Sequence, residues 1–195
     1  MNKKQLIAVG ALLALTGCSL LIPQTRYITE TFFPDFDVEI DTPAFQKNSG
    51  FTTHAELMSF LEKIVAENSS KVTMEVIGES QQGRSIPMVS FKHSNNPAVK
   101  VWLQGGLHGN EPASSEGLLW LIQQLVRDPA WAEVLEQAEI AIVPTVNVDG
   151  YEVQDRYADN GLDLNRDQTK LMVKESILLK RAFNKFSPDV AVDFH

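Results

Sequence analysis

Residues 101–112 read VWLQGGLHGNEP, and this stretch gives the clearest indication of the fold. An apolar run that starts at Val101 leaves through two glycines into His108, and Glu111 follows three residues later. A continuous apolar run is typical of an inner strand, because both of its faces are covered. In open sheets built of strands and helices, sites form at the carboxyl ends of the strands. We therefore expect His108 and Glu111 to lie at a functional edge of an α/β sheet.

The segments on either side predict the other elements of this fold. Residues with alternating or continuous apolar character give strands, and leucines at helical spacing give helices. Thr53 and Glu56 form a capping box at the start of the first helix, and Pro112 suits the first turn of the second. The expected strands occupy residues 71–80, 85–94, 99–106, 138–147 and 190–194, and the expected helices 52–68, 112–127 and about 172–186. This alternation predicts a mixed, partly parallel sheet with helices on both faces.

The sequence closes on SPDVAVDFH (187–195), a second strand that leads into a histidine. Val190 to Phe194 predict a short buried strand. If it runs parallel and close to the strand before His108, the imidazole of His195 reaches the same sheet edge. Two imidazole nitrogens and one carboxylate oxygen are the protein ligands of a catalytic zinc site, in which water takes the fourth position. The sequence therefore predicts one zinc ion bound by His108, Glu111 and His195.

Each part of this pattern alone also permits a simpler interpretation. A single His-x-x-Glu pair is weak support for a metal, and a histidine at a strand end is often a hydrogen-bonded core residue. The polar stretch 148–168 is expected to be a loop without regular structure, and most such loops are only solvated. A loop of this length in a compact domain is more often functional. Its Asn165-Arg166 pair suits a carboxylate held by parallel hydrogen bonds, and Arg156 offers a second cation.

The amino-terminal residues 1–20 read MNKKQLIAVGALLALTGCSL, which has the layout of a secretory signal. The apolar run is too short to be a dependable transmembrane helix. The LTGC ending resembles the lipobox of bacterial lipoproteins, which implies a lipid on Cys18; the alternative is an ordinary signal peptide with an incidental cysteine. Ser19 resembles the pattern of lipoproteins sent to the outer membrane. We expect an exported protein anchored by Cys18 to the bacterial cell envelope, in the outer membrane and facing the periplasm. The net charge of −8 argues against a nucleic-acid partner.

Five motifs together resemble one known family. IGESQQGRSIP, GGLHGNEP, NVDGY, NGLDLNRD and VDFH occur in the order and approximate spacing of the zinc carboxypeptidases, the M14 metallopeptidases. The resemblance covers about residues 51–195. It implies that residues 1–17 are a lipoprotein signal peptide, 18–50 a tether and N-terminal arm, and 51–195 the N-terminal portion of a zinc carboxypeptidase domain.

The resemblance also implies roles for individual residues. His108, Glu111 and His195 correspond to the zinc ligands, and Asp163 to the carboxylate that orients the first zinc histidine. Asn165 and Arg166 correspond to the pair that binds the terminal carboxylate of a peptide substrate, and Arg156 to the arginine that stabilises the oxyanion. The sequence departs from the family at three positions: Asn110, Val148 and Asp167.

The implied activity is zinc-dependent hydrolysis of the C-terminal peptide bond. Family members continue past the third histidine to a general-base glutamate, so the resemblance implies a truncated domain with little turnover of its own; neither Glu116 nor Glu152 is expected to replace that base. Two alternatives remain open. One is a zinc amidase or deacylase of the same fold, acting on murein peptides or N-acyl amino acids. The other is a non-catalytic lipoprotein remnant.

Overall fold

A mixed five-stranded sheet forms the centre of the part of the chain that the structure describes. The computed structural model describes residues 40–91 and 97–195, so the predicted signal peptide 1–17 and Cys18 lie outside the described residues. The strands are β1 (Val72–Glu79), β2 (Ser85–Phe91), β3 (Val99–Gln104), β4 (Ala138–Val143) and β5 (Val190–Asp193). The helices are α3 (His54–Glu67), α4 (Pro112–Arg127), α5 (Ala132–Gln137), α6 (Val148–Val153) and α7 (Lys174–Phe186), with 3-10 turns η1 (Pro43–Gln46), η2 (Pro129–Trp131) and η3 (Leu164–Arg166).

The order of the strands across the sheet is β1-β2-β4-β3-β5. β1 and β2 form an antiparallel hairpin, and β2 runs antiparallel to β4. β3 lies between β4 and β5 and is parallel to both. The predicted mixed, partly parallel sheet is therefore confirmed, and the strands before His108 and His195 are parallel neighbours.

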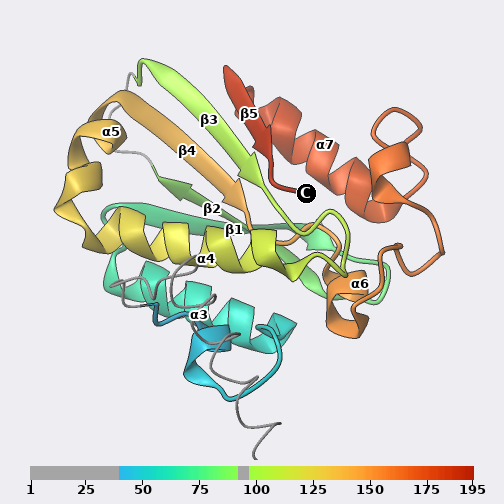
Figure 1. Cartoon of the computed structure of the whole chain (residues 1–195). Helices are drawn as coiled ribbons and strands as arrows, with labels where there is room; N and C mark the ends of the chain where they lie inside the picture. The colour runs from blue at the N-terminus through green and yellow to red at the C-terminus, as the bar shows by residue number, and fades with distance from the viewer. Residues whose placement is uncertain (1–39, 92–96) are drawn as a thin grey trace, which may run out of the picture. The chain divides into compact units, whose positions relative to one another are not determined.

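Helices cover both faces of this sheet (Figure 1). Successive residues of β3 point to opposite faces, as the geometry of a strand requires. Leu103 belongs to the core shared with α3 and α4, whereas Trp102 belongs to the core shared with α7. The Trp102 ring lies edge-on to Phe183, with centroids 5.4 Å apart, and 6.0 Å from the ring of Phe186. The single strand β3 is thus fixed from both sides, which holds its carboxyl end in place.

Helices α3 and α4, which pack on the same face of the sheet, begin as the sequence predicts. The Thr53 hydroxyl accepts a hydrogen bond from the Glu56 amide, and the Glu56 carboxylate accepts one from the Thr53 amide at 2.7 Å. This reciprocal pair is a complete capping box. α4 spans Pro112–Arg127, the predicted bounds, with proline in its first turn. Its start fixes the position of Glu111, which is the N-cap residue.

Three sequence expectations need correction. The stretch 148–168 is not free of regular structure, because it contains α6 and η3. The Asn147 side chain accepts from the Gly150 amide at the start of α6, and the Asp163 side chain accepts from the Asn165 amide at η3. The last helix was expected from about residue 172, but α7 begins at Lys174, and Met172 precedes it and is 67% exposed. Side-chain caps of this kind depend on local geometry, which apolar periodicity does not report.

The predicted burial of the last strand is the third error. All four residues of β5 are exposed. β5 pairs with β3 along one edge, and no other described strand pairs with its second edge.

Of the helices that the structure describes, none is both long and apolar enough to cross a membrane.

Candidate metal centre

His108 owes its position to a sharp turn at the carboxyl end of β3. Gly106 adopts a left-handed conformation with φ +58°. A Cβ atom there would lie 2.7 Å from the Ser115 hydroxyl and 2.9 Å from the Thr145 side chain, so this turn needs a glycine for two reasons. The chain then enters the core at Leu107, and His108 is fully buried.

Gly109 is needed for close packing against α6. Its φ lies outside the left-handed region, but a Cβ atom would come within 2.0 Å of the Gly150 carbonyl carbon and 2.3 Å of the Tyr151 amide nitrogen. The segment between the first two candidate ligands thus lies directly on the backbone of α6. Both glycines fix where the His108 side chain emerges.

His195 arrives from the neighbouring strand. β3 and β5 are in parallel register with Gln104 opposite Asp193, and hydrogen bonds continue beyond the strand ends. The Phe194 amide donates to the Gln104 carbonyl at 2.8 Å, and the Leu107 amide donates to the His195 carbonyl at 3.2 Å. The rings of His108 and His195 meet edge to face with centroids 4.4 Å apart.

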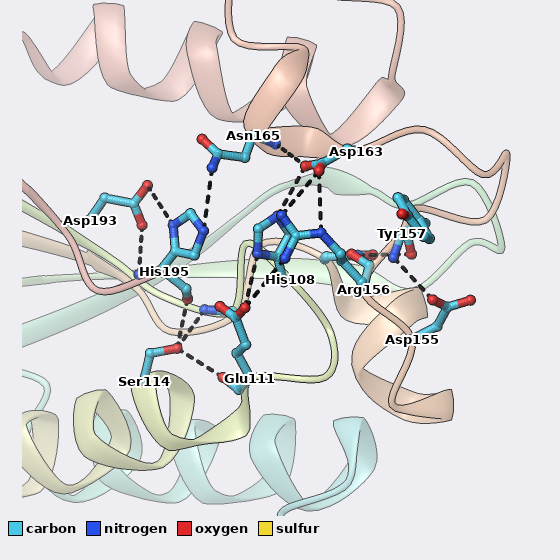
Figure 2. Close-up of polar contacts among 12 residues, drawn as sticks. His108, Glu111, Ser114, Asp155, Arg156, Tyr157, Asp163, Asn165, Asp193 and His195 are labelled. Carbon is cyan, nitrogen blue, oxygen red and sulfur yellow. Dashed lines mark hydrogen bonds and ion pairs between the residues drawn. The ribbon is translucent and has the colours of Figure 1, made fainter.

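The three predicted ligands converge on one point. His108, Glu111 and His195 each offer one donor atom, and these atoms all lie within 4.8 Å of one another. His108 has a fully buried side chain, whereas those of Glu111 and His195 are 40% and 39% exposed. The site is therefore anchored in the core on one side and open on the other. Figure 2 shows His108 at its centre, with Glu111 and His195 beside it. That these residues bind zinc stays a prediction.

Asp163 fixes which nitrogen of His108 is available. Its Oδ1 accepts from His108 Nε2 at 3.0 Å. Partial burial acts to raise the pKa of Asp163, but hydrogen bonds from His108, the Asn165 amide and Arg156 together hold that pKa below its ordinary value. An ionised carboxylate only accepts, so Nε2 carries the hydrogen of this bond. The Nδ1 atom faces Glu111 Oε1 at 3.2 Å. Two electron-pair donors this close need a proton or a cation between them.

Arg156 lies beside the same two carboxylates. Its guanidinium donates to Asp163 Oδ2 from Nε at 3.3 Å and from Nη2 at 3.1 Å, and its Nη1 is 3.5 Å from Glu111 Oε1. The buried amide of Asn147 positions the chain here, since it donates to the carbonyls of Arg156 and Tyr157 at 3.3 and 3.1 Å. Sequence reasoning assigned no role to Asn147. The available signal was an asparagine directly after an apolar strand, in NVDGY.

The two residues predicted to bind a carboxylate are placed differently. The Asn165 side-chain amide lies 3.4 Å from His195 Nε2, at the rim of the candidate metal centre. Arg166 is exposed, and among the described residues its guanidinium donates to the Asn165 carbonyl at 3.2 Å. The amide thus reaches the site in this conformation, and the long Arg166 side chain rests on the neighbouring backbone.

Glu116 and Glu152 are engaged away from the candidate metal centre. Glu116 accepts from the amide and hydroxyl of Thr52 at 2.7 and 2.8 Å and from the Tyr151 hydroxyl at 3.0 Å. Burial, reinforced by the charge of Glu116, raises the pKa of Tyr151. Glu152 accepts from the His54 amide. These contacts join α4 and α6 to the start of α3. That neither glutamate replaces the general base stays a prediction.

A second buried carboxylate joins two of the sequence motifs. Asp149, in NVDGY, accepts from the Ser80 hydroxyl and from Arg84 at 2.7 Å each, and from the Gln82 amide at 3.0 Å. These three donors all belong to the turn between β1 and β2. The motif IGESQQGRSIP therefore acts by holding the α6 segment, and through it the loop of Arg156.

The fold and the sequence can be compared with known proteins. The family model described as zinc carboxypeptidase, peptidase M14, matches residues 57–186. Carboxypeptidase 2 of Trichophyton rubrum is 36% identical over 155 residues, which cover 75% of this chain. Carboxypeptidase SOL1 of Arabidopsis thaliana is 28% identical over 141 residues, or 68% of this chain. The match ends before His195 and contains the other candidate residues of the site, which are His108, Glu111, Arg156, Asp163, Asn165 and Arg166.

Solved structures show the same fold. Carboxypeptidase A from Helicoverpa armigera aligns with a TM-score of 0.68 at 18% identity, covering 88% of this chain and 52% of that one. The metallo-carboxypeptidase from Burkholderia cenocepacia aligns with a TM-score of 0.65 at 19% identity, covering 71% of this chain and 39% of that one. This chain spans 29% of the length of the Trichophyton enzyme and 28% of the Arabidopsis one.

Proposed function

The chain belongs to the peptidase M14 family of zinc carboxypeptidases, and on that basis we propose that it carries the metal site and part of the substrate site of a zinc-dependent metallocarboxypeptidase. The reaction adds water across the last peptide bond of a peptide and releases its C-terminal amino acid. The observation that carries the proposal is the convergence of His108, Glu111 and His195 within 4.8 Å. Two of these residues come from parallel neighbouring strands and the third from the helix between β3 and β4, so the fold itself brings them together.

The donor set fits zinc. Two imidazoles and one carboxylate are typical of catalytic zinc, and they leave a fourth position for water. Zinc bound there would supply Lewis acidity, which polarises a carbonyl and lowers the pKa of a water ligand. Nδ1 of His108 lies 3.2 Å from the Glu111 carboxylate, so a cation that binds there can take a donor atom from each. A hydrogen bond from the second imidazole nitrogen to a carboxylate, as His108 makes to Asp163, is the usual support of a zinc histidine.

The remaining residues would act on the substrate. Arg156 is a fixed cation beside the ligands, placed to stabilise negative charge that develops on the carbonyl oxygen under attack. Asn165 lies at the rim of the site, and Arg166 is exposed and long enough to turn toward a ligand. A guanidinium with an adjacent amide binds a carboxylate through parallel hydrogen bonds. We propose that this pair selects substrates with a free terminal carboxylate.

Zinc stoichiometry tests the metal part of this proposal. The purified protein is expected to bind one zinc ion per chain, and His108→Ala is expected to bind none under the same conditions. His54→Ala is the matched control, because His54 contacts the Ser85 carbonyl and lies outside the cluster of candidate ligands. Stoichiometric zinc retained by His108→Ala would refute the ligand assignment.

Substrate class is tested by binding of three probes to the zinc-loaded protein. A short peptide with a free carboxylate is expected to bind, and the same peptide as its C-terminal amide is expected to bind at least tenfold more weakly, because a charge-assisted hydrogen-bond pair is lost. Arg166→Ala should remove that difference. Equal binding of acid and amide would contradict carboxylate recognition. Tighter binding of N-acyl amino acids than of peptides would favour the deacylase alternative.

We also propose a lipid anchor on Cys18, which would place the protein in the bacterial cell envelope, in the outer membrane. The support is the sequence LTGC after a basic and apolar start. Metabolic labelling with a palmitate analogue should mark the wild type, and Cys18→Ser should abolish the label and release the protein from membrane fractions. Membrane association of Cys18→Ser equal to that of the wild type would contradict the proposal.

A further inference from the structure

Ser114 lies where the three ligand-bearing segments meet. It belongs to the first turn of α4, and its hydroxyl makes three backbone contacts. It accepts from the Gly106 amide at 2.9 Å, lies 2.8 Å from the His195 carbonyl and lies 3.2 Å from the Glu111 carbonyl. Figure 2 shows Ser114 between Glu111 and His195. One hydroxyl therefore touches the turn before His108, the peptide of the second ligand and the peptide of the third.

The Ser114 hydroxyl has one hydrogen, so its contacts with the two carbonyls differ in strength. A hydroxyl donates once and accepts twice, so it cannot donate fully to both carbonyls. The shorter distance assigns the hydrogen to His195, and Glu111 receives a weaker share. The Gly106 amide donates to the Ser114 oxygen. This bond satisfies a backbone N–H that, because of the left-handed turn, does not point to a neighbouring strand. The contact between Ser114 and His195 thus links the first turn of α4 to the segment that follows β5.

The backbone at His195 needs such a link. His195 has φ +71°, in the left-handed region that a non-glycine residue adopts only when its surroundings hold it there. Its amide donates to Asp193 Oδ1 at 2.8 Å, and its carbonyl accepts from Ser114 and from the Leu107 amide. β5 is exposed and paired on one edge among the described strands. Hydrogen bonds to its amide and its carbonyl therefore help to hold His195 in this conformation.

We infer that Ser114 is a positioning residue for the metal centre, which sets the separation of the His195 imidazole from His108 and Glu111 by tying their backbones to one hydroxyl. This inference rests on the proposed function. Metal ligands must be held within about 0.5 Å of their working geometry. Loss of the hydroxyl would free the His195 peptide and leave the Gly106 amide without its partner, while all three donor atoms stay present.

The test compares four purified full-length proteins: wild type, Ser114→Ala, Ser114→Thr and Ser115→Ala. Ser115 is the matched control, because it is the next residue of α4 and its hydroxyl accepts from Thr145 at 2.9 Å rather than touching a ligand peptide. The apparent zinc Kd is measured by competition with a chromophoric chelator. The visible spectrum of the cobalt-substituted protein is recorded as well, since its bands report ligand geometry.

We expect Ser114→Ala to weaken zinc binding by roughly tenfold, the lower end of the range for residues that support metal ligands, and to change the cobalt spectrum. Ser114→Thr, which keeps the hydroxyl, should stay within about threefold of the wild-type Kd and keep its spectrum. Ser115→Ala should lose thermal stability without either change.

Two results would overturn the inference while leaving the proposed function intact. One is a Ser114→Ala protein with wild-type zinc affinity and cobalt spectrum. The other is a Ser114→Thr protein that loses affinity as much as a ligand variant does, which would also decide the matter if the alanine variant failed to fold. A wild-type protein that binds neither zinc nor cobalt would instead overturn the proposed function, and this inference with it.

Discussion

At the scale of single residues, chemistry in this site depends on which partner each side chain has. His108 turns Nδ1 toward Glu111 because its Nε2 donates a hydrogen bond to Asp163 at 3.0 Å. Asp163 stays ionised in that position because the hydrogen bonds that it accepts outweigh its partial burial. The orientation of one imidazole thus rests on a residue 55 positions further along the chain.

Asp163→Asn is expected to weaken zinc binding by roughly tenfold or more, because the amide loses the charge that fixes the His108 tautomer. The measurement is the zinc Kd by chelator competition. Asp159→Asn removes an exposed carboxylate that contacts Gln82 and serves as the control. An unchanged Kd in Asp163→Asn would mean that Asp163 does not orient the histidine.

Gly109→Ala should destabilise the fold by more than the roughly 1–3 kcal/mol that overpacking costs, because its Cβ would collide with the backbone of Gly150. Chemical denaturation measures the free energy of unfolding. Gly117→Ala is the matched control, since nothing lies within 4 Å of a Cβ at that position of α4, and it should stabilise the helix by about 0.5–1 kcal/mol. Two variants of equal stability would contradict the close packing.

The sequence allowed the residue types of the site to be predicted, but not the contacts that orient them. His108, Glu111 and His195 could be found because each follows a recognisable strand or opens a helix. Ser114 could not, because its role depends on backbone groups that approach only in the folded chain. Asn147 could have been selected from its position directly after an apolar strand, but the two carbonyls to which it donates could not.

At the scale of elements, parallel pairing of β3 with β4 and β5 creates the site edge. This pairing could be anticipated from two strands that lead into histidines. The regular structure within residues 148–168, α6 and η3, could not be anticipated, because short capped turns carry no apolar period. The exposure of β5 was also missed, since burial depends on what lies beside a strand and not on its composition.

Asp167 controls the turn before α7 and gives a pH prediction. Burial acts to raise its pKa, but hydrogen bonds from the Met172 and Val173 amides, at 2.9 and 2.8 Å, hold that pKa below the ordinary value. Its contribution to stability is therefore present above the unfolded pKa of about 3.9, and is lost as the pH falls through the lower folded pKa.

Asp167→Asn should accordingly lower the free energy of unfolding by roughly 1 kcal/mol at pH 7, and the difference from wild type should shrink as the pH is lowered toward 3. Urea denaturation at a series of pH values measures this difference. A gap that stays constant or widens on acidification would show that the charge of Asp167 does not support the turn.

At the scale of the whole described domain, one ion would join three elements. β3, α4 and β5 each bring one donor to the same point, so zinc that binds only the folded chain must stabilise it. At a free zinc concentration 100 times the Kd, the added stability is about 2.7 kcal/mol. Thermal unfolding with and without zinc should show this increase in the wild type and none in Glu111→Gln. Equal stabilisation of both proteins would place the ion elsewhere.

The central claim concerns the ligands themselves, and X-ray absorption at the zinc edge tests it most directly. For the zinc-loaded protein we predict two imidazole nitrogens at about 2.0–2.1 Å and oxygen ligands from one carboxylate and solvent. His195→Ala should reduce the imidazole count to one. A first shell without imidazole, or one that is unchanged in His195→Ala, would contradict the proposed metal centre.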